Sequence, residues 1–313
     1  MKYIEDFIED DKIVGHYLCR KKMTMKSKSN KSYLTLVLAD KTGEIDGKVW
    51  ELNNNIQSFA ENDFIKIDGD VVSFNNELQL RITKIRKSTE GEYNPQDYIP
   101  SSDKDVADIY TQLLGFIKTV SNPFIKQLLE NILVKNDEIV ASLKTHSAAK
   151  NMHHGYMGGL IEHILSVTQI CDFMSGRYKY VNRDILIAGA MLHDIGKLYE
   201  LSPFPENDYT DEGQLIGHIV MGTELITKEA ANIPNFPDTL KNLMKHMLLS
   251  HHGEYEFGSP KRPKIIEAFI LHCADNMDAK TKMFEEMIEK DNTQGAWMGY
   301  NKMLARYMRK TDL

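Results

Sequence analysis

The chain has 313 residues, which is enough for two domains that each bury a hydrophobic core. Hydrophobic residues make up 42% of it and charged residues 27%, as in ordinary soluble globular proteins. The net charge of −7 argues against indiscriminate binding of nucleic acid, although one domain can still carry a basic surface.

No export or membrane segment is expected. Residues 1–11 are acidic and interrupted by charge, unlike a signal peptide. No apolar run approaches the length of about 18 residues that a membrane helix needs. Cys19, Cys171 and Cys273 lie far apart, without the spacing of a metal site. This cysteine usage suits a reducing compartment, so we expect a cytoplasmic protein that does not contact a membrane.

The first ninety residues favour strands. Period-two alternation and β-forming residues predict an opening strand at 12–25 and further strands at 32–39, 44–50, 64–72 and 78–85. Asn75-Asn76 is typical of a hairpin turn between the last two strands. A brief helical piece is expected at 51–60. Five short strands in this order predict a small all-β barrel over residues 1–88.

Residues 34–45, which lead into Val49-Trp50, resemble the second and third strands of nucleic-acid-binding OB-folds. The resemblance implies that the basic residues 20–31 form the loop between strands one and two, beside the ligand groove. We therefore expect nucleic-acid contacts from Lys21, Lys22, Lys26 and Lys28. Base stacking is expected on Tyr33, Trp50 and Phe74. The alternative is a solvated loop, with the aromatic residues in the barrel core.

Residues 89–102 have the composition of a linker, with two prolines and a glycine. Apolar residues then recur at helical spacing, so residues 103–313 are predicted to form an all-α helical bundle. After a first helix that contains residues 106–117, helices are expected at 123–134, 159–174, 183–196, 217–231, 238–250, 264–290 and 296–309. The apolar residues of the last helix either pack inside the domain or make a homo-oligomer contact.

Residues with metal-ligand chemistry lie on apolar helix faces of this domain. His193 and Asp194 offer adjacent nitrogen and oxygen donors, and the carboxylate has a second oxygen with which to bridge another ion. A single inward histidine is explained by a hydrogen bond in the core. A carboxylate on a core face is harder to explain, because an unpaired buried charge costs several kcal/mol. Five such segments in one domain predict a metal site; they contain His163, His193-Asp194, His218, His251-His252 and Asp275.

The order of these residues resembles the HD superfamily of metal-dependent phosphohydrolases in its two-metal form. The resemblance implies that one ion is held by His163, His193, Asp194 and Asp275. It further implies that Asp194 bridges to a second ion held by His218 and His251. His252 is expected to contact substrate, with metal ligation as the alternative. Mixed nitrogen and oxygen ligation suits Mn²⁺, Fe²⁺, Co²⁺ or Ni²⁺, and does not choose among them.

The combination of an OB-fold with an HD domain resembles the YhaM family of bacterial 3′→5′ exoribonucleases across the whole chain. The segment Asn151–His163 is similar to that family's approach to the first ligand. The resemblance implies Mn²⁺-stimulated trimming of single-stranded RNA, and often of DNA, from the 3′ end.

Within that resemblance we expect hydrolysis at two metal ions. Lys197, about one helical turn after the His-Asp pair, is expected to add positive charge beside the phosphate. His154 and His252 are candidates to contact the phosphate or to protonate the leaving 3′ oxygen. Tyr156 is a candidate to stack on a terminal base. For His154, His252 and Tyr156 the alternative is a structural role.

Two other functions stay open. One is an HD phosphohydrolase that acts on small nucleotides, with the barrel in a regulatory role. The Gly-Tyr-Pro signature of cyclic-dinucleotide enzymes is absent after residues 251–253, which argues against the cyclic form of this function. The other is a catalytically silent nucleic-acid-binding protein, which is disfavoured because every expected ligand position is filled.

Overall fold

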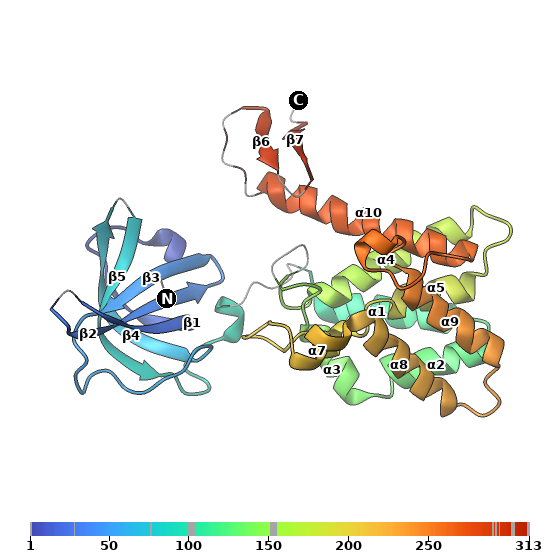
Figure 1. Cartoon of the computed structure of the whole chain (residues 1–313), viewed down its shortest axis with the longest axis horizontal. Helices are drawn as coiled ribbons and strands as arrows, with labels where there is room; N and C mark the ends of the chain where they lie inside the picture. The colour runs from blue at the N-terminus through green and yellow to red at the C-terminus, as the bar shows by residue number, and fades with distance from the viewer. Residues whose placement is uncertain are drawn as a thin grey trace. The chain divides into compact units, whose positions relative to one another are not determined.

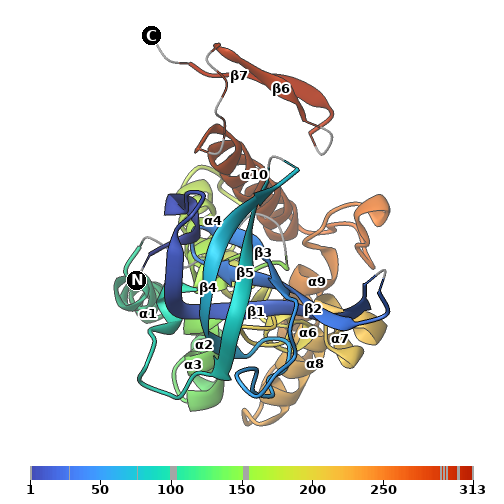
Figure 2. The same cartoon turned by 90° about the vertical axis from the view of Figure 1, so that its left-hand side faces the viewer.

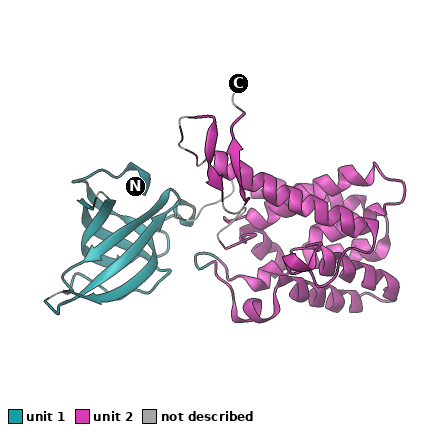
Figure 3. Cartoon of the chain, turned by 45° about the horizontal axis from the view of Figure 1, so that its top comes forward, with its two compact units in different colours: residues 1–103, 204–206 teal, residues 104–203, 207–313 magenta. Residues whose placement is uncertain are grey.

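The computed structural model describes residues 2–27, 29–75, 77–98, 104–150, 155–289, 291, 293, 295–301 and 304–311. The chain divides into two compact units, residues 1–103 with 204–206, and residues 104–203 with 207–313 (Figure 3). The first unit is a β-barrel and the second is largely helical. The predicted fold class, a small barrel followed by a helical domain, is therefore confirmed.

The barrel closes in the strand order β1-β2-β3-β5-β4 (Figure 2). Its strands are β1 (Lys12–Lys26), β2 (Ser32–Asp40), β3 (Gly43–Val49), β4 (Phe64–Phe74) and β5 (Glu77–Lys87). The pair β3–β5 is parallel, and the other four pairs are antiparallel. Inward-facing apolar residues fill the interior, among them Tyr17, Leu36, Leu38, Ile65, Ile67, Leu80 and Ile82.

Two details of the barrel differ from the sequence prediction. The helical piece expected at 51–60 is absent, because the run of three asparagines forms a turn in which the Asn53 side chain accepts a hydrogen bond from the amide of Asn55. The predicted strand at 12–25 and the predicted loop at 20–31 overlap, and residues 20–26 belong to the strand, because β1 stays paired with β2 as far as Lys26. Lys21, Lys22 and Lys26 therefore lie on a strand and not in the predicted loop.

Part of the predicted linker contacts the barrel. Residues Pro95–Asp97 form a short 3-10 turn, and Tyr98 after it is buried. Tyr93 stacks on Phe64 at a centroid distance of 4.2 Å, and Tyr98 meets the edge of the same ring at 5.3 Å. We therefore propose a linker shorter than the predicted 89–102, because these residues pack with the first domain.

The helical unit is organised around α5 (Arg183–Leu192), which is buried at every position from Ile185 onward. It packs against α4 (Gly159–Ser175), α9 (Asp238–Ser250) and α10 (Ile266–Glu289) (Figure 1). The other helices are α1 (Val106–Thr119), α2 (Pro123–Leu133), α3 (Asp137–Thr145), α6 (Lys197–Glu200), α7 (Asp211–Ile216) and α8 (His218–Ala231). The helix predicted at 183–196 ends at Leu192, and a turn over 193–196 precedes α6. The sequence prediction missed α3, α6 and α7.

The helix predicted at 296–309 is wrong, because these residues form an antiparallel hairpin of β6 (Trp297–Asn301) and β7 (Arg306–Arg309). Glycine at 295 and 299 disfavours a helix, and aromatic residues favour a strand. Met298 and Met308 pack inward on Met283, Phe284 and Met287 of α10. No helix in the described part of the chain is long and apolar enough to cross a bilayer.

Candidate metal centre

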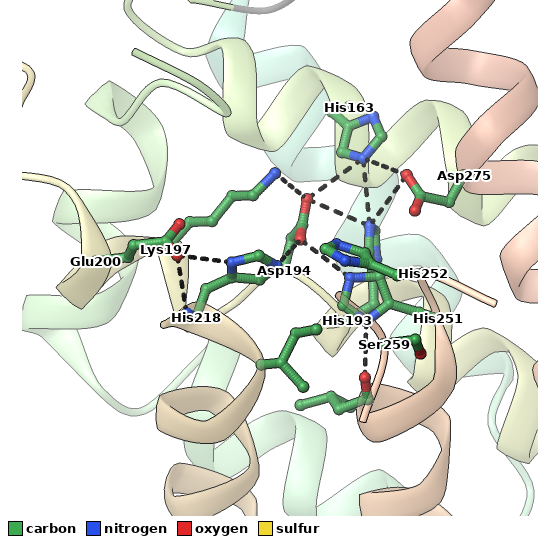
Figure 4. Close-up of polar contacts among 12 residues, drawn as sticks. His163, His193, Asp194, Lys197, Glu200, His218, His251, His252, Ser259 and Asp275 are labelled. Carbon is green, nitrogen blue, oxygen red and sulfur yellow. Dashed lines mark hydrogen bonds and ion pairs between the residues drawn. The ribbon is translucent and has the colours of Figure 1, made fainter. Parts of the chain in front are cut away.

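The structure brings the six predicted metal ligands together from five segments of the helical unit (Figure 4). His163 lies on α4, and the pair His193-Asp194 occupies the turn after α5. The remaining ligands are His218 at the start of α8, His251 after the end of α9, and Asp275 on α10. His163, His193, Asp194 and His251 are all buried. This clustering is what the sequence pattern predicts for a metal site.

The carboxylate of Asp194 lies between two groups of imidazoles (Figure 4). Its Oδ2 atom is 3.4 Å from Nε2 of both His163 and His193. Its Oδ1 atom is 3.6 Å from Nε2 of both His218 and His251. Each carboxylate oxygen therefore faces a separate cluster of nitrogen donors, which is the geometry needed to bridge two ions.

Asp275 and His252 complete the two clusters. Oδ1 of Asp275 is 3.2 Å from Nε2 of His163 and 3.9 Å from Nε2 of His193, so it belongs to the first. His252 belongs to the second, because His218, His251 and His252 offer ligand atoms that all lie within 4.8 Å of one another. This position favours metal ligation by His252, the alternative that the sequence left open.

Hydrogen bonds at Nδ1 orient the rings of three histidines of the centre, so that each ring points its Nε2 lone pair in a fixed direction. Nδ1 of His193 donates to the carbonyl of Ala190 at 2.8 Å, and Nδ1 of His251 donates to that of Leu248 at 2.7 Å. Nδ1 of His252 donates to the carbonyl of Phe257 at 2.9 Å. Because a carbonyl can only accept, the proton lies on Nδ1 and leaves Nε2 free to bind a cation.

Two carboxylates that the sequence analysis missed contact Nδ1 of the remaining histidines, His163 and His218. Oε1 of Glu200 accepts from both the amide and Nδ1 of His218, at 3.0 and 2.9 Å. Oδ2 of Asp278 lies 2.7 Å from Nδ1 of His163. Asp278 follows Asp275 by three residues and Glu200 follows Lys197 by three, so helical spacing was the signal that could have found them.

The donor set fits divalent cations. The Nε2 atoms of His218 and His251 are buried and have no hydrogen-bond partner in the described structure. An unsatisfied buried polar atom costs about 1–3 kcal/mol, and a metal ion between these nitrogens and Oδ1 of Asp194 would satisfy both. A set of imidazole and carboxylate donors is also the kind that first-row divalent metals bind.

The pKa shifts of the buried groups show that the centre favours a bound positive charge. Burial lowers the pKa of His163, but Asp194, Asp275 and Asp278 together raise that pKa well above its ordinary value. Burial raises the pKa of Asp194, but Lys197 and His193 hold it well below its ordinary value. Ionised carboxylates at the centre are what a bound cation requires.

Two glycines allow the ligand segments to approach one another. A Cβ on Gly196 would lie 2.0 Å from the carbonyl oxygen of His218, so a side chain there would push α8 away. Gly253, directly after His251-His252, has a φ of +80°, and a Cβ on it would lie 2.3 Å from the ring of His272. The positions of His218 and of His251-His252 therefore depend on these two residues.

A cavity of about 540 Å³ opens onto the centre. Its lining includes His163, Asp194, Lys197, His252, His272 and Asp275. A volume of this size accommodates a small ligand such as a nucleotide. Nζ of Lys197 contacts Oδ2 of Asp194 at 2.7 Å within this cavity, and its expected role beside a phosphate stays a prediction.

Two further candidate site residues, Tyr156 and His154, stay predictions. The hydroxyl of Tyr156 donates to Oε2 of Glu162 at 2.9 Å, which anchors the ring that we expected to stack on a base. His154 lies outside the described residues.

The barrel presents aromatic side chains to solvent. Tyr33 and Trp50 stack at a centroid distance of 4.6 Å. Trp50 is 51% exposed and Phe74 is 63% exposed, so the alternative that places these two in the barrel core is wrong.

The basic residues of the barrel divide into two kinds. Lys21 and Lys26 are exposed on β1, where they can contact a phosphate. Nζ of Lys22 instead donates to the carbonyl of Phe59 at 2.5 Å and lies 4.2 Å from the centre of that ring. The barrel itself therefore engages Lys22. Lys28 lies outside the described residues.

Comparison with known proteins agrees with the folds described for both units. Residues 160–280 match the HD domain family model, and residues 20–87 match that of the OB-fold nucleic acid binding domain. The 3'-5' exoribonuclease YhaM of Geobacillus sp. (strain WCH70) is 35% identical over 280 residues, which cover 88% of this chain and 85% of the relative. The 3'-5' exoribonuclease YhaM of Bacillus subtilis (strain 168) is 37% identical over 281 residues, which cover 88% of each chain.

Proposed function

The chain belongs to the YhaM family of 3′-5′ exoribonucleases, and from that membership we propose that it hydrolyses single-stranded RNA from the 3′ end. The reaction takes place in the cavity beside Asp194, on the HD domain. The observation that carries this proposal is the buried carboxylate of Asp194, whose two oxygens face two separate sets of Nε2 atoms. A bridging carboxylate of this kind is expected in a phosphodiester hydrolase that uses two metal ions.

The positions of the donors support a proposal of one ion on each side of Asp194. The first would be held by His163, His193, Oδ2 of Asp194 and Asp275, and the second by Oδ1 of Asp194, His218, His251 and His252. When bound, the two ions supply Lewis acidity and lower the pKa of a coordinated water. We propose Mn²⁺ as the native metal, with Fe²⁺, Co²⁺ and Ni²⁺ as the ions that share its ligand preferences.

The protein's own side chains orient the substrate. Lys197 provides a fixed positive charge on the cavity wall, where it stabilises negative charge on the phosphate. His154, four residues before Gly158 and the start of α4, is a further candidate for contact with the phosphate or the leaving 3′ oxygen. Tyr156 is retained as a candidate stacking surface for the terminal base.

The barrel supplies affinity for the strand. The stacked pair Tyr33–Trp50 and the exposed ring of Phe74 offer faces that accept any base. Lys21 and Lys26 are exposed and available to phosphates, whereas Lys22 is the weakest of the proposed contacts because its ammonium group is already bonded. Since stacking does not distinguish ribose from deoxyribose, single-stranded DNA is a second candidate substrate.

Time-resolved gels of 5′-labelled single-stranded RNA incubated with Mn²⁺ test this proposal. A ladder of products that shortens from the 3′ end supports it. Intact RNA together with hydrolysis of a mononucleotide or dinucleotide would instead indicate a small-nucleotide phosphohydrolase. Intact RNA with no hydrolysis of either substrate would indicate a silent binding protein. The same gel with 5′-labelled DNA determines whether the chain discriminates between the two nucleic acids.

A further inference from the structure

The C-terminal hairpin has one face that packs and one that does not. Met298 and Met308 are buried against α10, while Trp297, Tyr300 and Tyr307 on the other face are 64%, 52% and 65% exposed. Three large aromatic side chains in solvent on nine strand residues are unusual for a surface without a partner. Figure 1 shows the hairpin beyond the C-terminal end of α10.

The register of the hairpin places aromatic and basic side chains together. Tyr300 pairs with Tyr307 across the strands, with their rings 5.2 Å apart and at 67° to each other. Trp297 pairs with Arg309, and Asn301 pairs with Arg306. We call the side chains of Trp297, Tyr300, Tyr307 and Arg309 the hairpin face; the Asn301–Arg306 pair belongs to the opposite side, where Asn301 contacts Met287 of α10.

The charge of the hairpin face is complementary to a polyanion. Arg309 is exposed and its guanidinium donates only to the backbone carbonyl of Lys310, at 2.9 Å. It forms no ion pair within the described structure, and residues 295–301 and 304–311 contain no acidic residue. In a chain with a net charge of −7, this is a local basic and aromatic surface.

We propose that the hairpin face binds single-stranded RNA, with bases stacked on Trp297, Tyr300 and Tyr307 and a phosphate held by Arg309. Aromatic faces with interspersed cations are the general means of binding a strand without regard to its sequence. The proposal rests on the proposed exoribonuclease function and adds a contact on the helical unit, separate from the barrel.

The position of the hairpin predicts which part of the strand it binds. Asp275 and Glu289 lie on the same helix, α10, and are separated by 14 residues, or about 21 Å at 1.5 Å per residue. At about 3.4 Å per stacked nucleotide, a strand with its 3′ end at the metal centre needs about six nucleotides to cover that distance. The hairpin face therefore binds long RNA and cannot reach a trinucleotide held at the centre.

A second copy of this chain is the competing occupant, and two observations disfavour it. Four side chains form a small surface compared with the roughly 800 Å² per partner of a stable protein interface. A two-fold contact between identical faces would also bring the arginines of both copies close together.

Fluorescence anisotropy with end-labelled RNA tests the proposal. The full chain carries Asp194→Asn to prevent hydrolysis, and the probes are a dodecamer and a trinucleotide. Trp297→Ala with Tyr307→Ala is expected to weaken dodecamer binding by about tenfold or more, and trinucleotide binding much less. Tyr180→Ala, at an 82% exposed tyrosine on the same unit, is the matched control and is expected to bind like the parent.

A second variant tests the charge alone. Arg309→Gln should lower the slope of log K against log salt by about 0.7, the value for one lost phosphate contact on a single strand. Dodecamer affinity and salt slope equal to the parent in both variants would overturn the proposal while leaving the exoribonuclease function intact. Light scattering that shows a parent oligomer dissociated by the aromatic substitutions would also overturn it, in favour of self-association. A parent chain that binds no RNA would contradict the proposed function itself.

Discussion

Replacing Glu200 with Gln should weaken one of the two proposed metal sites and leave the other intact. Glu200 makes two charge-assisted hydrogen bonds to His218, at its amide and at Nδ1. It touches none of the residues of the first cluster, which depends on Asp278 for the orientation of His163. The effect of the substitution is therefore expected to be confined to the ion held by His218, His251 and His252.

The size of the effect follows from the contacts that change. Gln keeps the shape of Glu and one acceptor oxygen, but it loses the negative charge that strengthens both bonds. A hydrogen bond to a charged group contributes about 1.5–3 kcal/mol, against about 0.5–1.5 for a neutral one. A loss of about 1.4–2.8 kcal/mol in binding free energy corresponds to a 10–100-fold lower affinity for the ion. This matches the usual cost of removing a carboxylate that supports a metal-bound histidine.

Isothermal titration of the metal-free chain with Mn²⁺ measures the two affinities separately. Glu200→Gln should show one site weakened and one unchanged, and Asp278→Asn should show the reverse pattern. Glu224→Gln, at an exposed position on α8, is the matched control and should bind like the unmodified chain. Equal weakening of both sites by Glu200→Gln, or no weakening at all, would refute the separation of the donors into two clusters.

Four other substitutions test the remaining assignments. Lys197→Ala should retain both metal ions and lower the single-turnover rate on RNA by about 100-fold; loss of bound metal would mean that Lys197 instead organises the ligands. Tyr33→Ala and Trp50→Ala should weaken RNA binding by about 1–3 kcal/mol per stacked base, with far less effect on turnover of bis-p-nitrophenyl phosphate. Equal losses on both substrates would mean that the barrel helps to build the active site. Gly196→Ala should destabilise the helical unit by about 1–3 kcal/mol in thermal unfolding, while Gly115→Ala, whose Cβ meets no atom within 4 Å, should not.

The sequence contains enough information to find the ligands of the metal centre. His163 follows the buried Leu160 by about one helical turn and Asp275 follows the buried Leu271 in the same way, and His193-Asp194 comes after a run that is buried throughout. Local periodicity indicates that these polar groups point inward, and burial of a carboxylate demands a compensating partner. The sequence alone therefore predicts which side chains form the candidate metal centre.

The partners of these ligands are not visible in the same way. The role of Glu200 depends on the start of α8, 18 residues further along the chain, lying against α6. The choice of Nδ1 as the protonated nitrogen depends on carbonyls that only the folded turns place beside the rings. Which oxygen of Asp194 faces which cluster is a tertiary property that spacing cannot supply.

The C-terminal hairpin shows a different limit. The apolar residues of 296–309 satisfy a helical period almost as well as a period of two, so pattern alone does not choose between them. The choice is made by packing, because Met298, Leu304 and Met308 reach one cluster on α10 only when the chain turns back on itself. Ala305, with a φ of 51°, lies immediately before β7 at that reversal.

Metal content per chain in Asp194→Asn tests the central claim most directly. The amide is nearly isosteric with the carboxylate but lacks its charge, and it offers only one oxygen to two clusters that each require an anionic donor. Plasma mass spectrometry should find two divalent ions in the unmodified chain and fewer in the variant, with an unchanged circular dichroism spectrum and no hydrolysis of single-stranded RNA in the same samples. Two ions per chain and normal RNA turnover in Asp194→Asn would contradict the assignment of Asp194 as the bridge.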